Sequence, residues 1–319
     1  MKELKLWISI LDSLVKSKIV ALIIVAESSN SSPGKQGFKM AVNEDEVLFG
    51  TIGGGIMERD LLNTARENLK NNKKRFIKTL YHNQSDKNES SGLICGGKQT
   101  FIFNFLNESN IDLVNKIISY LEAQTGSVLV NSQNGIFVQT NISQMEKFVF
   151  NYAHENIFEY KEIYGIPDTV YIIGGGHVGL ALSKVMANLD FYIVIVDHRD
   201  EVFTMSENIY AHKKIIMDYD KIGNVINDGT NTFIAIVSPQ HIGDEAALKS
   251  VLHKNVKYIG MMGSKKKIKT IFENLLKSGI DKELLNKVHS PIGLEIGAES
   301  PDEIAISIAA EIIKVKYNN

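Results

Sequence analysis

The chain has a single cysteine, Cys95, so it cannot form an internal disulfide bond. It also lacks a long apolar segment. The longest apolar run, Ile19 to Ala26, has the length of a strand, whereas a membrane-spanning helix needs about 20 apolar residues. The first residues form a charged amphipathic stretch without a small-residue cleavage site, which does not fit a secretory signal. These features predict a cytoplasmic protein that does not enter the membrane.

Charge of one sign is not in excess either. The net charge is −2, and no helix has the obvious pattern of a basic DNA-binding helix, so there is no electrostatic reason to expect binding to nucleic acid or to an anionic membrane. Apolar residues make up 44% and charged residues 23% of the chain, which is ordinary for a soluble globular protein. A length of 319 residues favours two domains.

The N-terminal part, residues 1–165, predicts a mixed α+β domain. Helical spacing of apolar residues predicts helices over 4–15, 56–69 and 111–123. Strands are expected over 19–26, 37–42, 47–52, 74–81 and 99–105. The segment from Phe150 to Pro167 has no clear periodicity. We therefore place a linker there and the domain boundary between residues 165 and 166.

The C-terminal part, residues 166–319, changes character at Thr169. From there, short β-branched strands at 169–173, 192–196, 233–237 and 258–259 alternate with helical stretches. Alternation of this kind is typical of a doubly wound parallel sheet. The predicted fold class is thus α/β, with an N-terminal mixed domain followed by a Rossmann-like domain.

A glycine pattern marks the most specific candidate site. Gly174, Gly176 and Gly179 form G-x-G-x-x-G between a predicted strand and helix, and Asp197 ends the next strand. In dinucleotide-binding domains, these glycines permit a tight turn, the approach of a phosphate and close helix packing. The helix that follows this motif offers free N–H groups to an anion, and Asp197 is placed to accept hydrogen bonds from ribose hydroxyls. We interpret this segment as a phosphate-ligand site; the alternative is a Rossmann fold that has lost its ligand.

A second candidate anion site follows a later strand. Gly260, Gly263 and Ser264 precede a helix that opens with Lys265 to Lys267. Ligands of open α/β sheets bind outside the carboxyl ends of the strands, so this segment is expected to form an adjacent wall of the same crevice, without a metal. The alternative is an ordinary capped helix with solvated lysines.

Several neighbouring residues have two open interpretations. His177 lies within the glycine motif, His198 and Arg199 follow Asp197, and His241 lies near the end of a third strand with Asp244 beyond it. Each is either a ligand contact or an ordinary loop residue, and Arg199 in particular is suited to meet a phosphate. The glycine-rich segment 289–298 is another candidate for the ligand edge of the sheet.

The N-terminal domain carries two glycine-containing candidates. A triple glycine precedes a helix and resembles a phosphate-cradling turn, although it lacks the lysine of a P-loop. Cys95 is followed by two glycines, and it is either a buried small apolar residue or an accessible thiolate beside backbone N–H groups. The candidate cofactor-binding residues here are Gly53, Gly54, Gly55, Glu58, Gly96 and Gly97.

Read together, these segments resemble the XdhC/CoxI family over nearly the whole chain. The order and spacing of the motifs, rather than any single motif, carry the resemblance. The motifs are Ser31-Ser32-Pro33 with Gly37 and Met40, Gly50 to Gly55 with Glu58, Cys95-Gly96-Gly97, Gly174 to Gly179 with Asp197, Gly260 to Ser264 with its lysines, and Pro291 to Ala298 with Pro301 and Glu303.

The resemblance implies a two-domain, dimeric accessory protein rather than an enzyme. Such a protein binds the molybdenum–pterin cofactor as cargo, holds it for sulfuration with a cysteine desulfurase, and delivers it to a xanthine-dehydrogenase-type molybdenum hydroxylase. Cys95 is then the candidate for sulfur handling, and the Rossmann domain holds either the cofactor or a dinucleotide. Two alternatives remain open: an NAD-dependent oxidoreductase, for which no acid/base constellation is evident, and a nucleotide-sensing regulator.

The sequence departs from the family pattern at three positions. Gly34 stands where the family often has arginine, Ile56 where many members have cysteine, and Glu295 where aspartate is usual. The change at Ile56 leaves Cys95 as the only thiol.

Overall fold

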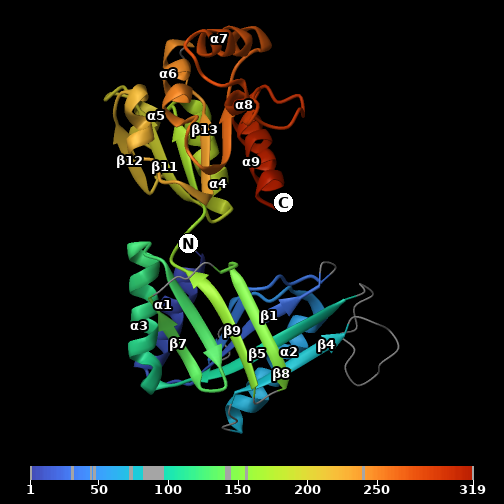
Figure 1. Ribbon diagram of the computed structural model, residues 1–319. Helices are drawn as coiled ribbons and strands as arrows, with labels where there is room; N and C mark the ends of the chain where they lie inside the picture. Colours follow the sequence, from blue (N-terminus) through green and yellow to red (C-terminus); the bar gives the residue numbers. More distant parts are fainter. Residues whose placement is uncertain are drawn as a thin grey trace. The chain divides into compact units, whose positions relative to one another are not determined.

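The chain forms two compact units, Met1–Ile166 (unit 1) and Pro167–Asn319 (unit 2). Figure 1 shows the computed structural model. It describes residues 2–29, 32–43, 45, 48–71, 75–81, 97–140, 145–154, 157–238 and 241–317.

Unit 1 contains a five-stranded antiparallel sheet with the order β3-β2-β1-β5-β4. Its strands are β1 (Val20–Ser28), β2 (Lys39–Asn43), β3 (Leu48–Gly50), β4 (Phe76–Tyr81) and β5 (Lys98–Leu106). The central strand β1 is apolar along most of its length because it is buried on both faces. Leu22 and Ile24 belong to one apolar cluster, whereas Ile23 and Val25 belong to another. The continuous apolar run at 19–26 follows from this double burial.

A second, four-stranded antiparallel sheet in unit 1 has the order β7-β6-β9-β8. Helices α1 and α3 lie side by side (Figure 1) and share one apolar core with the two sheets. Helix α2 covers the other face of the first sheet through Met57 and Leu61. The remaining elements of unit 1 are α1 (Lys2–Val15), α2 (Gly55–Lys70), η1 (Glu108–Asn110), α3 (Ile111–Ala123), β6 (Ser127–Ser132), β7 (Gly135–Gln139), β8 (Phe148–His154) and β9 (Ile157–Tyr164).

The predicted linker at 150–167 is wrong over most of its length, because β8 and β9 occupy it. Side chains alternate between buried and less buried along β9, as a half-buried strand requires. The buried set nevertheless includes Glu162, while Ile163 faces the other way. An inward-facing glutamate removes the apolar period that would identify the strand from sequence.

Unit 2 is built on a six-stranded parallel sheet with the order β12-β11-β10-β13-β14-β15. Counted from β10, this is the strand order of a Rossmann fold, so the predicted fold class is confirmed. The strands are β10 (Thr169–Ile173), β11 (Tyr192–Asp197), β12 (Lys213–Ile216), β13 (Gly229–Ile236), β14 (Val256–Met261) and β15 (Val288–His289). Neither edge strand, β12 nor β15, was expected from sequence.

Helices cover both faces of this sheet. Helices α4 and α9 pack with one apolar cluster, whereas α6 and α7 pack with another. Strands β10 and β13 are neighbours, yet α4 and α6, which follow them, lie on opposite faces. A crevice for ligands opens at such a switch point, outside the carboxyl ends of the strands. The helical segments are α4 (His177–Asn188), α5 (Phe203–Ser206), η2 (Tyr219–Asn224), α6 (His241–Val251), α7 (Lys265–Lys277), α8 (Lys282–Leu285) and α9 (Pro301–Tyr317).

Within the described residues, no helix has both the length and the apolar content needed to cross a membrane.

Candidate functional site

The glycine loop of unit 2 connects β10 to α4 at the switch point. Gly174 has a φ of 121°, and a Cβ there would lie 2.8 Å from the Ser238 backbone. A Cβ on Gly179 would lie 2.0 Å from the Gly174 carbonyl oxygen, so α4 starts directly against the loop. Gly176 differs from both, because its φ is −73° and a Cβ would meet no atom of the described residues within 4 Å. The middle glycine therefore faces open space that packing does not explain.

The start of α4 has no side-chain cap. Gly176 is its N-cap residue and has no side chain with which to accept a hydrogen bond. The first N–H groups of a helix have no partner inside the helix, and at this end they carry the positive end of the helix dipole. An uncapped start beside open space is suited to a phosphate.

Asp197 closes the loop from the end of β11. It is fully buried, and its Oδ2 accepts from the Gly175 N–H at 2.7 Å and from Nη2 of Arg199 at 2.9 Å. Its Oδ1 accepts from the backbone N–H and Nε of Arg199 at 3.0 and 2.9 Å. Burial raises the pKa of this carboxyl, but hydrogen bonds from Arg199 and Gly175 outweigh burial and lower its pKa to about 2. Asp197 thus positions the loop and Arg199.

The other predicted wall of the crevice is largely occupied by contacts within the protein. Ser264 caps α7 by accepting from the Lys267 N–H at 3.2 Å. Buried Asp244 accepts from the Lys267 ammonium and the Ser238 hydroxyl. A Cβ on Gly260 would collide with the Tyr258 hydroxyl and Ile292. These contacts join the ends of β13 and β14 to α6 and α7.

The segment 289–298 is tied to α9 through Glu311. The Glu311 carboxylate accepts from the Tyr258 hydroxyl at 2.6 Å and from the Gly293 N–H at 2.8 Å, and it lies 3.3 Å from Nδ1 of His289. Tyr258 also stacks on His289. These contacts anchor the segment to α9.

The triple glycine of unit 1 is closed by its own helix. Oε2 of Glu58 accepts from the Thr51 hydroxyl at 2.6 Å and from the N–H groups of Ile52 and Gly54, both at 2.9 Å. Burial raises the pKa of Glu58, but these hydrogen bonds outweigh it and the pKa is lowered. A carboxylate thus already holds the N–H groups of Ile52 and Gly54, and its negative charge disfavours a phosphate at this turn.

Gly34 explains one departure from the family pattern. A Cβ on Gly34 would lie 1.9 Å from the Ile52 carbonyl oxygen, and one on Gly53 would lie 2.7 Å from the Gly34 nitrogen. The two loops thus meet backbone to backbone, and an arginine does not fit at position 34 in this arrangement.

Some predicted residues have no structural description. Cys95, Gly96, Ser31, Pro239 and Gln240 lie outside the described residues, as does the side chain of His241. Gly97 is described, with a φ of 155°, next to the start of β5.

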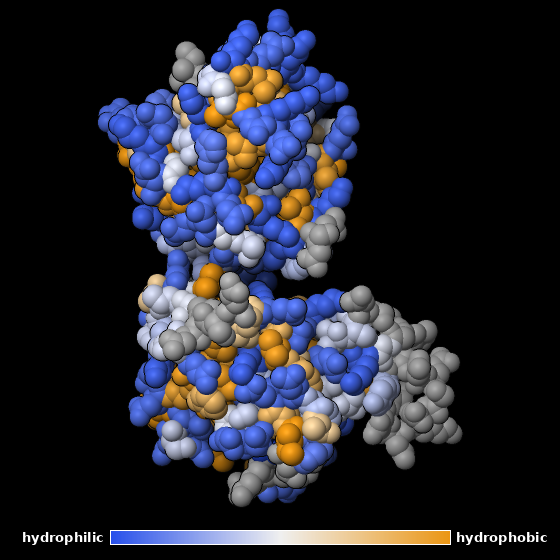
Figure 2. Space-filling model, in the orientation of Figure 1, coloured by the Kyte–Doolittle hydropathy of each residue, from blue (hydrophilic) through white to orange (hydrophobic). Residues whose placement is uncertain are grey.

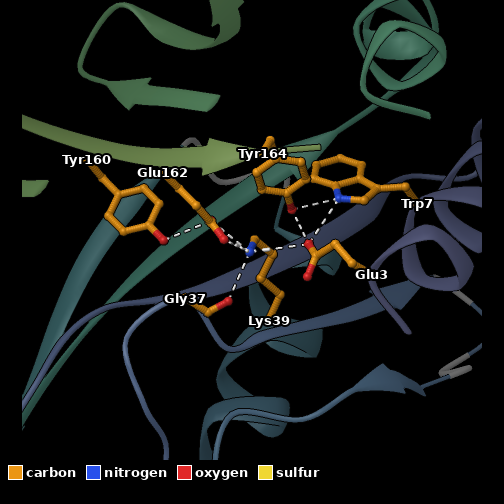
Figure 3. Close-up of polar contacts among 7 residues, drawn as sticks. All are labelled: Glu3, Trp7, Gly37, Lys39, Tyr160, Glu162 and Tyr164. Carbon is orange, nitrogen blue, oxygen red and sulfur yellow. Dashed lines mark hydrogen bonds and ion pairs between the residues drawn. The ribbon is translucent and has the colours of Figure 1, made fainter. Parts of the chain in front are cut away.

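Sequence reasoning missed a buried ionic cluster in unit 1, shown in Figure 3. The Lys39 ammonium lies 2.8 Å from Glu162 and 3.2 Å from Glu3, and it donates to the Gly37 carbonyl oxygen at 2.9 Å. The Tyr160 hydroxyl donates to Glu162 at 2.9 Å. The cluster joins β2, β9 and α1, which lie far apart in the sequence, so no local pattern indicates it.

Aromatic side chains complete this cluster. The indole N–H of Trp7 donates to the Tyr164 hydroxyl at 2.9 Å, and Tyr164 donates to Glu3. Burial lowers the pKa of Lys39, but Glu162 and Glu3 outweigh it and raise the pKa above its usual value. Burial raises the pKa of Glu162, and Lys39 lowers it only in part. Lys39 and Glu162 are buried, and only Glu3 of the ionic groups reaches solvent, so we assign the cluster to the stability of unit 1.

Comparisons with known proteins agree with this architecture. The family model described as the XdhC Rossmann domain matches residues 170–312, and the XdhC and CoxI family model matches residues 15–81. A crystal structure of a xanthine dehydrogenase from Bacillus halodurans superposes with a TM-score of 0.73 at 23% identity. The match covers 97% of this chain and 95% of that one, and it shows the shared fold.

Two curated proteins are similar in sequence. The uncharacterized protein YqeB of Escherichia coli (strain K12) is 23% identical over 303 residues, which cover 93% of this chain and 44% of YqeB. A probable xanthine dehydrogenase subunit of Bacillus subtilis (strain 168) is 26% identical over 145 residues, 46% of this chain and 42% of that protein. The matches thus span less than half the length of these relatives. With both family models matched in the expected order, the chain belongs to the XdhC family.

Proposed function

We propose that this chain is a cytoplasmic accessory factor that binds the molybdenum–pterin cofactor as cargo. It would hold the cofactor while a cysteine desulfurase supplies sulfur, and then deliver it to a xanthine-dehydrogenase-type molybdenum hydroxylase. Membership of the XdhC family and similarity to a protein named for xanthine dehydrogenase support an accessory role for such a client. The chain itself would act as a binding and delivery factor rather than as a catalyst.

The contrast between the two glycine turns carries the proposal. In unit 1, Glu58 occupies the N–H groups of the turn. The starts of α2 and α4 are both without a side-chain cap and both have open space at a glycine among the described residues. They differ in that Asp197, the carboxylate at the loop of unit 2, is paired with Arg199, which leaves the start of α4 suited to a phosphate. The molybdenum–pterin cofactor ends in a phosphate, so we assign its phosphate end to the loop Gly174–Gly179. When bound, the cofactor would supply the metal and pterin chemistry of the client, while the loop holds and orients it.

The runner-up, an NAD-dependent oxidoreductase, is less well supported. NAD is held at this edge through ribose hydroxyls that donate to a free carboxylate. Both oxygens of Asp197 already accept from protein donors. Asp197, the residue that favoured NAD in the sequence, therefore positions the glycine loop and Arg199 in the structure.

Contacts with protein partners are part of the proposal. Figure 2 shows apolar patches on the mainly polar surface of each unit. In unit 2, Phe203 and Ile209 are 75% and 84% exposed. Phe203 starts α5, whose Thr204 donates to the Gly175 carbonyl oxygen. Exposed apolar groups beside a ligand loop are suited to a partner that receives the ligand. We also propose a homodimer, on the family resemblance.

The test is Gly176→Val, which places a side chain in front of the loop without a clash. We expect a folded protein that binds the molybdenum–pterin cofactor at least tenfold more weakly in titration calorimetry, a loss of about 1.4 kcal/mol or more. Thr270→Val is the control, because this exposed position of α7 lies outside both candidate sites and its hydroxyl donates to the Lys266 carbonyl oxygen of the same helix, and its affinity should match the parent protein. Unchanged affinity of Gly176→Val would show that the loop does not hold the cofactor.

A further inference from the structure

The end of β11 has an arrangement that differs from a common dinucleotide site. There, a carboxylate normally accepts from the ribose hydroxyls of NAD, whereas an arginine receives the 2′-phosphate of NADP. The sequence places Asp197 at this position, followed closely by Arg199. In the structure the carboxylate is fully buried and accepts from four donors, all from Gly175 and Arg199. Asp197 is therefore not available to ribose hydroxyls.

Arg199 is the group that this edge presents instead. Its side chain is 38% exposed, although its Nε and Nη2 are fixed to the two oxygens of Asp197 at 2.9 Å each. An arginine has five N–H donors, so these two contacts leave three for a ligand. A guanidinium held in a bidentate contact loses little freedom on binding, which favours recognition of a second anion.

The same carboxylate connects this arginine to the phosphate loop. Gly175 donates to Asp197 from within the glycine loop, so the start of α4 and Arg199 are held at one edge by a single buried side chain. A ligand that reached both would need two anionic groups, one at the loop and one at the end of β11. In an adenine nucleotide, these are the 5′-phosphate and a phosphate on the ribose.

We propose that this crevice accepts a nucleotide of the NADP type, with a phosphate monoester on its ribose, in preference to one of the NAD type with free ribose hydroxyls. The inference rests on the proposed function in one respect, which is that the loop Gly174–Gly179 receives a phosphate. Because both ligands need that loop, the nucleotide and the molybdenum–pterin cofactor exclude each other.

Two matched probes test this preference with the full chain. Adenosine 2′,5′-bisphosphate and adenosine 5′-monophosphate differ only in the 2′-phosphate. We expect the bisphosphate to bind at least tenfold more tightly in titration calorimetry at fixed ionic strength. Equal affinities, or no binding of either probe, would overturn the inference.

Variants of Arg199 test whether its side chain causes the preference for the 2′-phosphate. Arg199→Ala should remove the preference for the bisphosphate, and because it also frees acceptor positions on Asp197, affinity for the monophosphate should not fall. Arg199→Lys, which keeps the charge but not the bidentate contact, should retain part of the preference and provides the test if Arg199→Ala does not fold. The control is Arg59→Ala, an arginine of unit 1 whose side chain is 69% exposed, and it should leave the preference unchanged. Equal losses for both probes in Arg199→Ala would contradict the assignment.

Failure of this inference is distinguishable from failure of the proposed function. Cofactor that binds the parent protein but not Gly176→Val, together with no preference between the two nucleotides, would refute the inference alone. A clear nucleotide preference without cofactor binding would refute the assignment of the cofactor to the loop and retain the inference.

Discussion

Replacing Lys39 by methionine should destabilise unit 1 strongly. The side chain of Lys39 is 1% exposed and that of its partner Glu162 is 8% exposed, so the substitution leaves a buried carboxylate without its cation. Breaking a buried ion pair in this way typically costs about 3–5 kcal/mol of unfolding free energy. Glu3 is 31% exposed and reaches solvent, so we expect it to add little to this cost.

A double variant separates the charge effect from packing. In Lys39→Met with Glu162→Gln, no charge is left unpaired at these two positions, and the new amide oxygen still accepts from the Tyr160 hydroxyl. Replacement of a whole buried pair is often neutral or stabilising. We therefore expect the double variant to recover most of the stability that Lys39→Met loses.

The stability of Lys39→Met should also depend on pH, because the carboxylate of Glu162 has lost its cation. Burial already raises the pKa of Glu162 in the parent protein, and loss of Lys39 should raise it further. Between the unfolded and folded pKa values the native state then binds more protons than the unfolded state, so stability falls as pH rises. Lys39→Met should regain stability when the pH is lowered from 7 towards the usual glutamate range near 4.3.

Trp7 makes the measurement specific to unit 1. It is the only tryptophan of the chain and donates to Tyr164 within this cluster. Urea unfolding followed by its fluorescence reports on unit 1 even if the two units unfold separately. A loss below about 1 kcal/mol for Lys39→Met, or a double variant as unstable as the single one, would refute the reasoning.

Two further predictions concern the proposed function. Cys95→Ala should reduce activation of the client hydroxylase in a reconstitution assay and leave the melting temperature unchanged; unchanged activation would exclude a role in sulfur handling, and a fall in melting by several degrees would indicate a buried structural side chain. Light scattering at micromolar concentration should give twice the 35.6 kDa chain mass, and a monomer mass would contradict the proposed homodimer.

Elements with local signals could be predicted from sequence. Helix α3 occupies Ile111–Ala123 and β10 occupies Thr169–Ile173, each as predicted, because apolar spacing or a β-branched run marks them. The edge strand β12 was missed because its four residues are mostly exposed and half of them are lysine. It pairs with β11 over its whole length, so long-range hydrogen bonds rather than local preference define it.

The buried cluster of unit 1 shows why a whole strand was missed. Glu162 is the residue that breaks the apolar alternation of β9, and inside the fold its carboxylate is paired with Lys39 of β2 at 2.8 Å. A sequence pattern treats each residue by its own polarity. It does not register a lysine and a glutamate, 123 positions apart, that satisfy each other inside the fold.

Asp197 shows the same limit at the candidate site. The sequence predicts an acidic residue at the end of β11, and the structure confirms this position. The glycine pattern predicts that ribose hydroxyls bind to this residue. The ligand that Asp197 can bind depends on how many of its acceptor positions remain free after donors of the protein itself have bound to its oxygens. Arg199 lies only two residues away and donates to both oxygens from its side chain and its backbone N–H, while Gly175 adds a fourth donor. A nucleotide signature therefore predicts ligand specificity only once the hydrogen bonds of its acidic residue have been counted. Here that count turns a position expected to recognise hydroxyls into one that presents a cation.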